Sequence, residues 1–266
     1  MAKIRLDVLL VNRGLFESRA RVQAEIMAGN ILVNEVKVDK PGTPTKEDVA
    51  IRILGSRIPY VSRGGLKLEK ALKVFPIDLQ DKVIADIGAS TGGFTDCALQ
   101  NGAVKVYAVD VGYGQLAWAL RQDRRVVNLE RTNVRNLTVE MLGEKVDGAT
   151  IDVAFISLNL VLPAVAGVLK EEGFIVALIK PQFEAGKDKV GKKGVVREAA
   201  THKEVIDKVL AFVRGMGLVP AGLDYSPIRG PEGNIEYLLY ARKVGTDAVT
   251  GAVVEKVVEA SHGGEK

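Results

Sequence analysis

The sequence predicts an α/β protein in which a doubly wound, mostly parallel sheet follows a small α+β domain. From residue 83 onward, short apolar runs alternate with segments of helical periodicity, which is the pattern of a parallel sheet covered by helices on both faces. The first sixty residues differ, because two helical segments precede short strand-like runs and ten Lys and Arg residues accompany seven Asp and Glu residues. We therefore expect two domains, residues 1–59 and residues 60–266.

The composition is that of an ordinary soluble globular protein, with 47% hydrophobic and 26% charged residues in a chain of 266. A formal net charge of +4 allows a polyanionic partner without requiring one. Cys97 is the one cysteine, so no internal disulfide can form and a reducing, cytoplasmic location is expected. Because only His202 and His262 accompany it, we expect Cys97 to be a buried structural thiol and the protein to hold no metal.

We also expect no membrane partner. The first five residues lead directly into an amphipathic helix and show no signal peptide. The most apolar window, residues 151–169, contains Asp152, Ser157, Asn159 and Pro163, so we interpret it as a buried strand followed by a packed helix. The sequence gives no indication of the oligomeric state.

The N-terminal segment predicts two helices and a few short strands. Leucines give residues 5–12 an apolar helical face, and Ser18 can cap a second helix over residues 19–28. Residues 31–38 have the pattern of two strands joined by a tight turn, and residues 49–54 that of a last strand, with an irregular stretch between them. Arginines on paired helices suit an RNA backbone, because guanidinium groups bind phosphates through two parallel hydrogen bonds. Charge alone would fit a solvated helix face equally well.

The order of motifs in this segment goes beyond charge. Over residues 5–53 the sequence closely resembles the S4 RNA-binding domain, which occurs in a ribosomal protein of the small subunit and in RNA-modifying enzymes. The motifs are Arg5-Leu-Asp-Val-Leu-Leu, Arg13-Gly-Leu, Ser18-Arg-Ala-Arg21 and Met27-Ala-Gly-Asn-Ile-Leu-Val-Asn34. The resemblance implies that RNA is contacted by Arg5, Arg13, Arg19 and Arg21.

The larger domain follows a linker, residues 55–65, that is rich in Gly, Pro and Ser. We expect its elements to alternate along the chain, with the last two strands forming an antiparallel edge and the chain ending in a disordered tail over residues 261–266. The expected helices are 66–75, 93–101, 115–122, 157–170, 198–216 and 245–260, and the expected strands are 83–87, 104–110, 125–129, 148–155, 173–179, 218–226 and 235–242.

A glycine-rich turn, Gly88-Ala-Ser-Thr-Gly-Gly93, joins the first strand of this domain to a helix. Such a turn is where a nucleotide-like cofactor binds in a doubly wound sheet. Ser90 replaces the second glycine of a dinucleotide fingerprint, but Asp110 ends the next strand about 20 residues downstream, where an acid binds a ribose. A purely structural turn stays open as the alternative. The expected cofactor residues are Asp86, which would organise the turn, and Gly88, Ala89, Ser90, Thr91, Gly92, Gly93 and Asp110.

Charged residues follow or precede several strands at the edge where ligands bind. Asp152 and Lys180 end two strands, Glu236 begins the last one, and Lys67 lies on the helix before the first. Buried charges are costly unless they are paired, so this pattern favours chemistry over packing. By spacing alone, a structural Asp–Lys pair remains an alternative.

In this order the four residues resemble the K-D-K-E tetrad of FtsJ-type RNA ribose 2′-O-methyltransferases. Together with the S4 segment and the motifs Ser62-Arg-Gly-Gly-Leu-Lys67, Lys180-Pro-Gln-Phe-Glu184 and Gly233-Asn-Ile-Glu236, nearly the whole chain resembles the TlyA family. The resemblance implies a Rossmann-like class I methyltransferase sheet, S-adenosylmethionine as cofactor and methylation of cytidine 2′-hydroxyls in ribosomal RNA, with ribosomal RNA or subunits as partner. Some members of the family are named haemolysins.

The implied chemistry is an in-line methyl transfer to a ribose hydroxyl that must give up its proton. A lysine can accept that proton when a second ammonium and partial burial lower its pKa. We assign Lys180 as the base or hydroxyl-polarising group and Lys67 as the second lysine, which also orients the ribose. Asp152 and Glu236 would hold the lysines and balance the charge.

The segment between Gln182 and Arg197 carries five basic residues and two acids. We interpret it as a mobile loop that contacts RNA through Lys189, Lys192 and Lys193, although an exposed charged loop without this role is the simpler alternative.

Two further functions stay open at this point: an RNA-binding assembly factor with little transferase activity, and a haemolysin. Neither a hydrophobic span nor a secretion signal favours the haemolysin. Ser90 and the lack of a plausible hydride-transfer partner disfavour an NAD-linked dehydrogenase.

Overall fold

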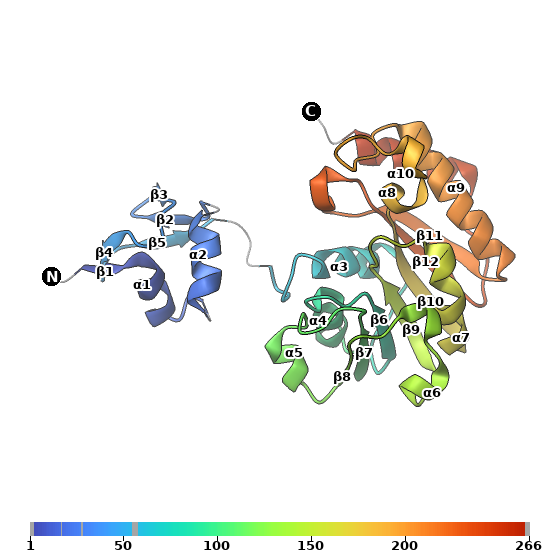
Figure 1. The fold of residues 1–266 in the computed structure, drawn as a ribbon, viewed down its shortest axis with the longest axis horizontal. Coiled ribbons are helices and arrows are strands. Elements are labelled where there is room, and N and C mark those ends of the chain that lie inside the picture. The colour runs from blue at the N-terminus through green and yellow to red at the C-terminus, as the bar shows by residue number, and fades with distance from the viewer. Residues whose placement is uncertain (1–2, 17, 28, 55–57, 264–266) are drawn as a thin grey trace. The chain divides into compact units, whose positions relative to one another are not determined.

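The computed structural model describes residues 3–16, 18–27, 29–54 and 58–263. The chain divides into two compact units, Met1–Arg57 and Ile58–Lys266, drawn in Figure 1. Among the described residues, no helix combines the length and the apolar character that crossing a bilayer requires.

The smaller unit packs two helices, α1 (Leu6–Asn12) and α2 (Arg19–Met27), against short antiparallel strands. A three-stranded sheet has the order β3-β2-β5 and comprises β2 (Ile31–Val33), β3 (Val36–Val38) and β5 (Ile51–Ile53). A second pair, β1 (Lys3–Arg5) with β4 (Pro44–Lys46), was not predicted, because three residues are too few to show a periodicity. Leucine, isoleucine and valine side chains from both helices and β2 form its core.

The larger unit is built on a seven-stranded sheet of order β11-β12-β10-β9-β6-β7-β8 (Figure 1). Five neighbouring strands are parallel, and β12 is antiparallel to both β10 and β11. This confirms the doubly wound sheet with an antiparallel edge. The strands are β6 (Val83–Ile87), β7 (Lys105–Val109), β8 (Val126–Leu129), β9 (Val146–Ile151), β10 (Leu169–Ile179), β11 (Val219–Tyr225) and β12 (Tyr237–Arg242).

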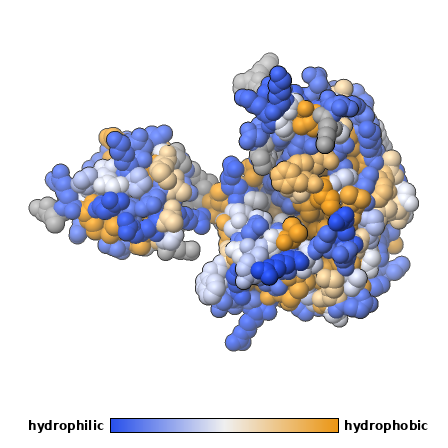
Figure 2. Space-filling model, in the orientation of Figure 1, coloured by the Kyte–Doolittle hydropathy of each residue, from blue (hydrophilic) through white to orange (hydrophobic). Residues whose placement is uncertain are grey.

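Helices cover both faces of this sheet, and each face has its own hydrophobic cluster. One cluster lies under α3 (Gly65–Val74), α4 (Gly93–Gln100) and α5 (Trp118–Gln122), and it contains the buried thiol of Cys97, as expected. The opposite cluster lies under α6 (Val139–Leu142), α7 (Leu162–Val168), α9 (Ala199–Gly215) and α10 (Gly251–His262). Figure 2 shows that one face of the unit carries hydrophobic residues in its middle and hydrophilic residues around them.

Several expectations for element boundaries were wrong. Strand β10 begins at Leu169 rather than residue 173, and helix α10 begins at Gly251 rather than residue 245. Strand β9 ends at Ile151 rather than residue 155, so residues 152–155 form a loop. The helix expected from residue 157 begins at Leu162, with proline in its first turn, and is preceded by the short helix η2 (Leu158–Leu160). Ser261 and His262, placed in a disordered tail, belong to α10, and Ser261 is buried. Gly263 caps that helix, and residues 264–266 of the expected tail lie outside the described residues.

The register of β12 decides where the functional residues meet. Because β12 is antiparallel to its neighbours, its first residue lies at the carboxyl end of the parallel strands. Tyr237 pairs with Ile179 of β10, and Ala177 of β10 pairs with Ile151 of β9. The residues just outside these pairs are Lys180, Glu236 and Asp152. They therefore converge at the carboxyl edge of the sheet, where the parallel strands end.

Candidate active site

Two lysines and two acids form one ion-pair cluster at this edge. The Nζ atom of Lys67 lies 2.6 Å from Oε2 of Glu236 and 3.2 Å from Oδ2 of Asp152. The other oxygen of Asp152, Oδ1, lies 2.5 Å from Nζ of Lys180. Among the described residues, Lys67 therefore binds two carboxylates and Lys180 binds one.

The cluster is enclosed by protein. The exposed fractions are 7% for Lys67, 8% for Lys180 and 1% for Glu236, while the Asp152 side chain keeps 19%. Burial alone would lower the pKa of Lys67, but the carboxylates of Asp152 and Glu236 raise it above its usual value. Burial alone would raise the pKa of Asp152, yet the two ammonium groups hold it below its usual value. Lys67 is thus a fixed cation and Asp152 a fixed anion.

A tight contact between two loops holds Lys67 at the site. The turn before α3, Ser62–Gly65, packs directly on Gly93 at the start of α4. A Cβ atom on Gly93 would lie 2.3 Å from Oγ of Ser62 and 2.8 Å from the backbone nitrogen of Gly65. The glycine-rich turn and the helix that carries Lys67 can approach this closely only because residue 93 has no side chain.

The glycine-rich turn is fixed by Asp110, at the carboxyl end of the neighbouring strand β7. One carboxylate oxygen accepts a hydrogen bond from the backbone nitrogen of Ser90 at 2.8 Å, and the other from that of Gly112 at 2.7 Å. Gly88 has φ +82°, and a Cβ atom there would lie 2.6 Å from the carbonyl oxygen of Asp152. The turn therefore lies against the backbone of the residue that joins the two lysines.

Asp86 lies behind the turn, where it is 1% exposed. Its carboxylate accepts hydrogen bonds from the hydroxyls of Thr95 at 2.6 Å and Thr150 at 3.0 Å. Burial raises the pKa of Asp86 to about 6, and the two hydroxyls oppose this shift. Asp86 thus connects β6, α4 and β9 beneath the turn.

The residues that shape the loop after β9 were not predicted from the sequence. Glu184, in the short helix α8 (Pro181–Glu184), accepts hydrogen bonds from the Ser157 hydroxyl and the Leu158 backbone nitrogen, both at 2.7 Å. In the loop that Glu184 holds, Phe155 has φ +62° and its side chain is 90% exposed, 5.1 Å from the ring of Phe183. An apolar residue three positions after Asp152 was the available signal, but the pattern predicted a buried strand there.

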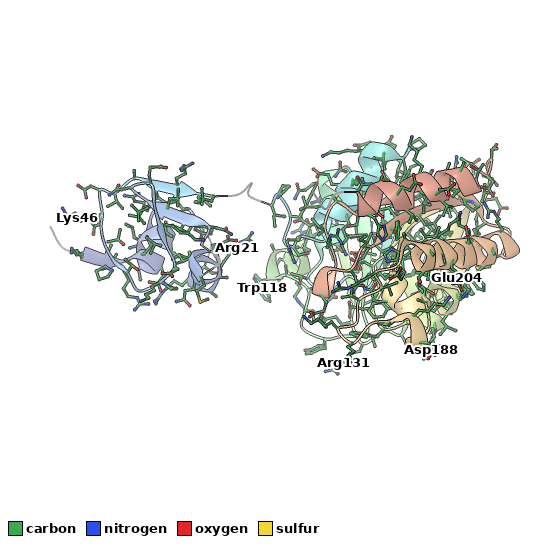
Figure 3. The ribbon with its side chains drawn as sticks, turned by 90° about the horizontal axis from the view of Figure 1, so that it is seen from above. Arg21, Lys46, Trp118, Arg131, Asp188 and Glu204 are labelled. Carbon is green, nitrogen blue, oxygen red and sulfur yellow. The ribbon has the colours of Figure 1, made fainter. Side chains whose placement is uncertain are left out.

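The four arginines of the smaller unit differ in what holds them. Arg5 and Arg19 both bind Asp7, at 3.0 and 2.8 Å, and Arg13 bonds the carbonyl of Glu47. The side chain of Arg21 projects from α2 into solvent (Figure 3). Asp7 is fully buried, and the sequence analysis did not single it out. It presents two half-exposed guanidinium groups side by side, as a phosphate-binding surface would require.

We expect Asp7→Asn to destabilise the smaller unit. The Arg5 guanidinium, with Arg19 and Gln23, holds the pKa of Asp7 well below its usual range. The pKa of Asp7 is lower in the folded state than in the unfolded state, where it is near 4, so the ionised carboxylate stabilises the fold at pH values above about 4. This stabilisation is lost as the pH falls below about 4 toward the folded-state pKa. At pH 7 the free energy of opening of the smaller unit should be about 2 kcal/mol lower in the variant than in the wild type, and this difference should shrink toward pH 3.

Hydrogen exchange of α1 and α2 amides measures this opening. The matched control is Asp39→Asn, since Asp39 is exposed and its removal should change stability by less than about 0.5 kcal/mol. Equal effects of the two substitutions would contradict the assignment to Asp7.

The three lysines of the basic segment after α8 differ in their surroundings. Lys189 binds Glu204 of α9, and Lys189 with Lys208 lowers the pKa of Glu204 to about 2. Glu204 projects from the outer side of α9 (Figure 3). Lys192 and Lys193 are exposed at the tip of a tight turn, in which the backbone nitrogen of Gly194 bonds the carbonyl of Gly191 at 2.8 Å. Two of the three predicted lysines are therefore available to a partner.

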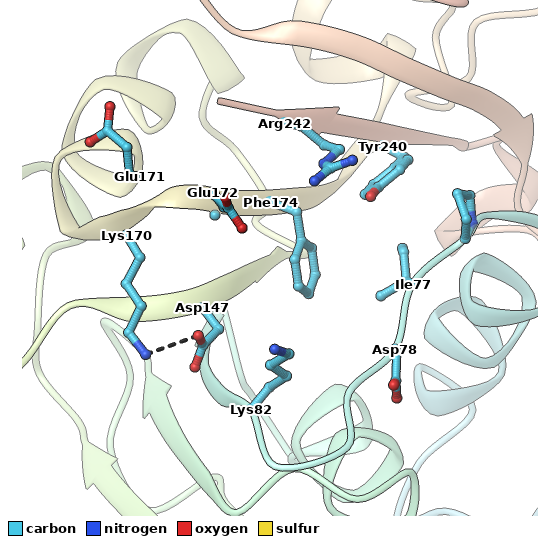
Figure 4. A pocket seen from close by; sticks show the side chains of 12 residues that line it. Ile77, Asp78, Lys82, Asp147, Lys170, Glu171, Glu172, Phe174, Tyr240 and Arg242 are labelled. Atoms are coloured by element: carbon cyan, nitrogen blue, oxygen red, sulfur yellow. Dashed lines mark hydrogen bonds and ion pairs between the residues drawn. The ribbon is translucent and has the colours of Figure 1, made fainter. Parts of the chain in front are cut away.

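A separate cavity of about 560 Å³ lies at the opposite ends of the strands (Figure 4). Phe174 and Tyr240 line it together with acidic and basic residues. Among these, Lys170 forms an ion pair with Asp147 at 2.9 Å. It faces the amino ends of β6 and β9, whereas doubly wound sheets bind their ligands at the carboxyl ends.

Comparison with known proteins agrees with this geometry. The FtsJ-like methyltransferase profile matches residues 60–243, and the S4 domain profile matches residues 4–51. The candidate rRNA methyltransferase YqxC of Bacillus subtilis is 51% identical over 98% of this chain and 94% of its own. The 16S/23S rRNA (cytidine-2′-O)-methyltransferase TlyA of Mycobacterium tuberculosis is 42% identical over 96% of each chain. The structure of a candidate hemolysin from Streptococcus thermophilus is 47% identical with a TM-score of 0.79, covering 99% of this chain and 97% of that one.

The doubly wound sheet, the glycine-rich turn and the profile match define a methyltransferase preceded by an S4 domain. The chain belongs to the FtsJ-like methyltransferase family and, within it, to the TlyA family. The resemblance described in the sequence analysis is thereby confirmed.

Proposed function

We propose that this chain transfers a methyl group from S-adenosylmethionine to the ribose 2′-hydroxyl of a cytidine in ribosomal RNA. One observation carries the proposal: the four residues Lys67, Asp152, Lys180 and Glu236, scattered over 170 positions of the chain, meet in a single buried cluster. A purely structural ion pair would need two charges rather than four, and buried charges are weak contributors to stability. The relatives named as cytidine 2′-O-methyltransferases support the substrate class.

The residues around the glycine-rich turn fit S-adenosylmethionine. Gly88 and Gly93 let the turn pack closely against Asp152 and Ser62, and Ala89, Ser90, Thr91 and Gly92 complete a cradle for the amino-acid part of the cofactor. Asp110 directly follows β7, where a ribose would lie, and Val111 beside it is 76% exposed, an apolar face for an adenine ring. When bound, the cofactor supplies an electrophilic methyl group on a sulfonium.

The ion pairing assigns different tasks to the two lysines. Lys67 is held by two carboxylates that raise its pKa, so it remains a cation and can orient the ribose by donating hydrogen bonds. Within the described part of the chain Lys180 has a single carboxylate partner, so it is the better candidate to accept or share the hydroxyl proton. Asp152 lies between the two ammonium groups and weakens the like-charge repulsion that the sequence analysis invoked. Its main task is therefore to fix Lys180 beside the hydroxyl.

The smaller unit and the basic turn supply the RNA contacts. Arg5, Arg13, Arg19 and Arg21 would bind phosphates, and Lys192 and Lys193 would add contacts next to the catalytic edge. Such contacts are sequence-independent, so they position the target without choosing the base.

Incubating the pure protein with tritiated S-adenosylmethionine and unmodified ribosomal subunits tests the function. We expect label on a ribose 2′-oxygen of one or both subunit RNAs, mapped by nuclease digestion and mass spectrometry. Cofactor binding without any label would instead support an RNA-binding assembly factor. Liposome lysis by unlabelled pure protein would support the haemolysin name of some relatives.

We expect Phe155→Ala to weaken use of the RNA substrate. An exposed ring beside the cluster offers a platform for a base that has left its stack, and base–aromatic stacking contributes about 1–3 kcal/mol. The value of kcat/KM should fall about tenfold, mainly through KM, in steady-state assays with subunits. Phe155→Tyr is the control, because it keeps the ring and should keep the activity. Similar losses in both variants would argue against stacking.

A further inference from the structure

A buried hydrogen-bond network lies directly behind the active site, and the proposed mechanism does not use it. His202 of α9 is fully buried. Its Nδ1 atom lies 2.7 Å from the hydroxyl of Tyr237, and its Nε2 atom lies 2.9 Å from the carbonyl oxygen of Val196. A carbonyl oxygen can only accept, so Nε2 carries the proton and Nδ1 accepts from the tyrosine. Burial lowers the pKa of His202, which favours this neutral ring.

One arm of the network ends at the turn that carries Lys192 and Lys193. The carbonyl oxygen of Val196 accepts a hydrogen bond from His202. The backbone nitrogen of Val196 donates one to Oδ1 of Asn234 at 3.2 Å. The Asn234 amide in turn donates to the carbonyl of Gly194 at 2.9 Å. These bonds fix the base of the turn.

Packing alone does not hold this segment. The side chain of Val196 enters the core, but residues 195–197 also line a cavity of about 310 Å³. On that side the segment borders open space rather than packed side chains. The hydrogen bonds of Val196 therefore set where the two exposed lysines lie.

The other arm of the network ends at the cluster. Tyr237 directly follows Glu236, which binds Lys67 at 2.6 Å. Besides His202, the Tyr237 hydroxyl lies 3.0 Å from Oγ of Ser261 in α10, and the tyrosine side chain is fully buried. The side chain of Tyr237 thus anchors the start of β12 from the face opposite the cluster, since successive strand residues point to opposite faces.

We propose that His202 is a positioning residue that fixes the basic turn and Glu236 relative to each other. Its Nε2 atom acts on the turn through Val196, and its Nδ1 atom acts on Glu236 through Tyr237. The proposal rests on the proposed function, because it gives the turn a role in RNA binding and Glu236 a role in the reaction. His202 contacts neither reacting group, so its effect is carried by Val196 and Tyr237.

Two substitutions separate the two arms. The amide of Asn reaches the place of Nδ1, so His202→Asn keeps an acceptor for Tyr237 and loses the bond to Val196. The amide of Gln reaches the place of Nε2, so His202→Gln keeps a donor for Val196 and loses the acceptor for Tyr237. Tyr237→Phe removes the same bond as His202→Gln from the other side and serves as its matched control.

For His202→Asn we expect trypsin to cleave after Lys192 and Lys193 about tenfold faster than in the wild type, because the turn has lost an anchor and a buried carbonyl is unsatisfied. The KM for ribosomal subunits should rise about tenfold, with kcat within twofold. For His202→Gln and Tyr237→Phe we expect wild-type cleavage of the turn and wild-type KM, with kcat about fivefold lower. The dissociation constant for S-adenosylmethionine should stay within twofold in all three.

Parallel changes of KM, kcat and cleavage in His202→Asn and His202→Gln would overturn the proposal, since a packing residue would affect both arms together. The cleavage comparison does not depend on catalysis. A wild-type protein that methylates neither subunit would therefore defeat the proposed function, while the anchoring of the turn would still be decided by proteolysis.

Discussion

Lys180→Ala is expected to lower the rate of methyl transfer by about 10²–10⁴-fold, the usual contribution of a positioned general base. The dissociation constant for S-adenosylmethionine should change less than about twofold, because Lys180 bonds Asp152 and no residue of the glycine-rich turn. Single-turnover transfer of tritiated methyl groups measures the first quantity, and isothermal titration the second.

A second substitution at this position separates proton transfer from charge. Arginine keeps the positive charge but cannot give up its proton, so Lys180→Arg should be nearly as inactive as the alanine variant. Lys73→Ala is the matched control, because Lys73 is an exposed lysine on the helix that carries Lys67, and it should retain wild-type rates. Substantial activity in Lys180→Arg would assign Lys180 an electrostatic role, and lost cofactor binding in Lys180→Ala would remove the assignment altogether.

Gly88→Ala is expected to be the most damaging single methyl addition in the larger unit. The new Cβ would lie 2.6 Å from the carbonyl oxygen and 3.0 Å from the carbonyl carbon of Asp152, and neither backbone atom can rotate away. Either the cofactor turn or Asp152 must shift by a few tenths of an ångström or more, and displacements approaching 1 Å at a reacting centre cost about 10²-fold in rate. We expect losses of about that size in both kcat and cofactor affinity.

Gly114→Ala isolates the steric part of this effect. Gly114 also has a positive φ, +74°, but a Cβ there would meet no atom within 4 Å. Its substitution should bring only backbone strain of about 1 kcal/mol and leave the rate nearly unchanged. If the two alanine variants lost activity equally, the clash with Asp152 would not be the cause.

The sequence predicted those helices and strands whose residues follow a local pattern of apolar and polar side chains. Strand β6 was placed at its observed bounds, because a short run of four apolar residues, interrupted by Asp86, ends in a glycine-rich turn. The meeting of Lys67 with Glu236 came from a family resemblance rather than from spacing, since 169 positions separate them. Spacing alone left a structural Asp–Lys pair open, because periodicity says which face a residue takes and not which distant residue it meets.

The residues that escaped prediction act through such distant contacts. Asp7 had the appearance of a polar residue on a short helix, and only the fold brings Arg19 onto it. His202 was considered as a metal ligand and set aside, although its partners Val196 and Tyr237 lie 6 and 35 positions away. Phe155 was misplaced because an apolar residue after a strand fits a buried continuation better than an exposed loop.

The position of β12 also decides when during its own synthesis the protein becomes an enzyme. This strand is inserted between β10 and β11, and the residue just before it completes the cluster with Lys67. The smaller unit, by contrast, is complete within the first 57 residues. A nascent chain can therefore fold its arginine-bearing unit early, but it has no complete cluster until residue 236 and the strand after it have emerged from the ribosome. A chain whose synthesis stops before that point would retain the S4 domain without the means to methylate.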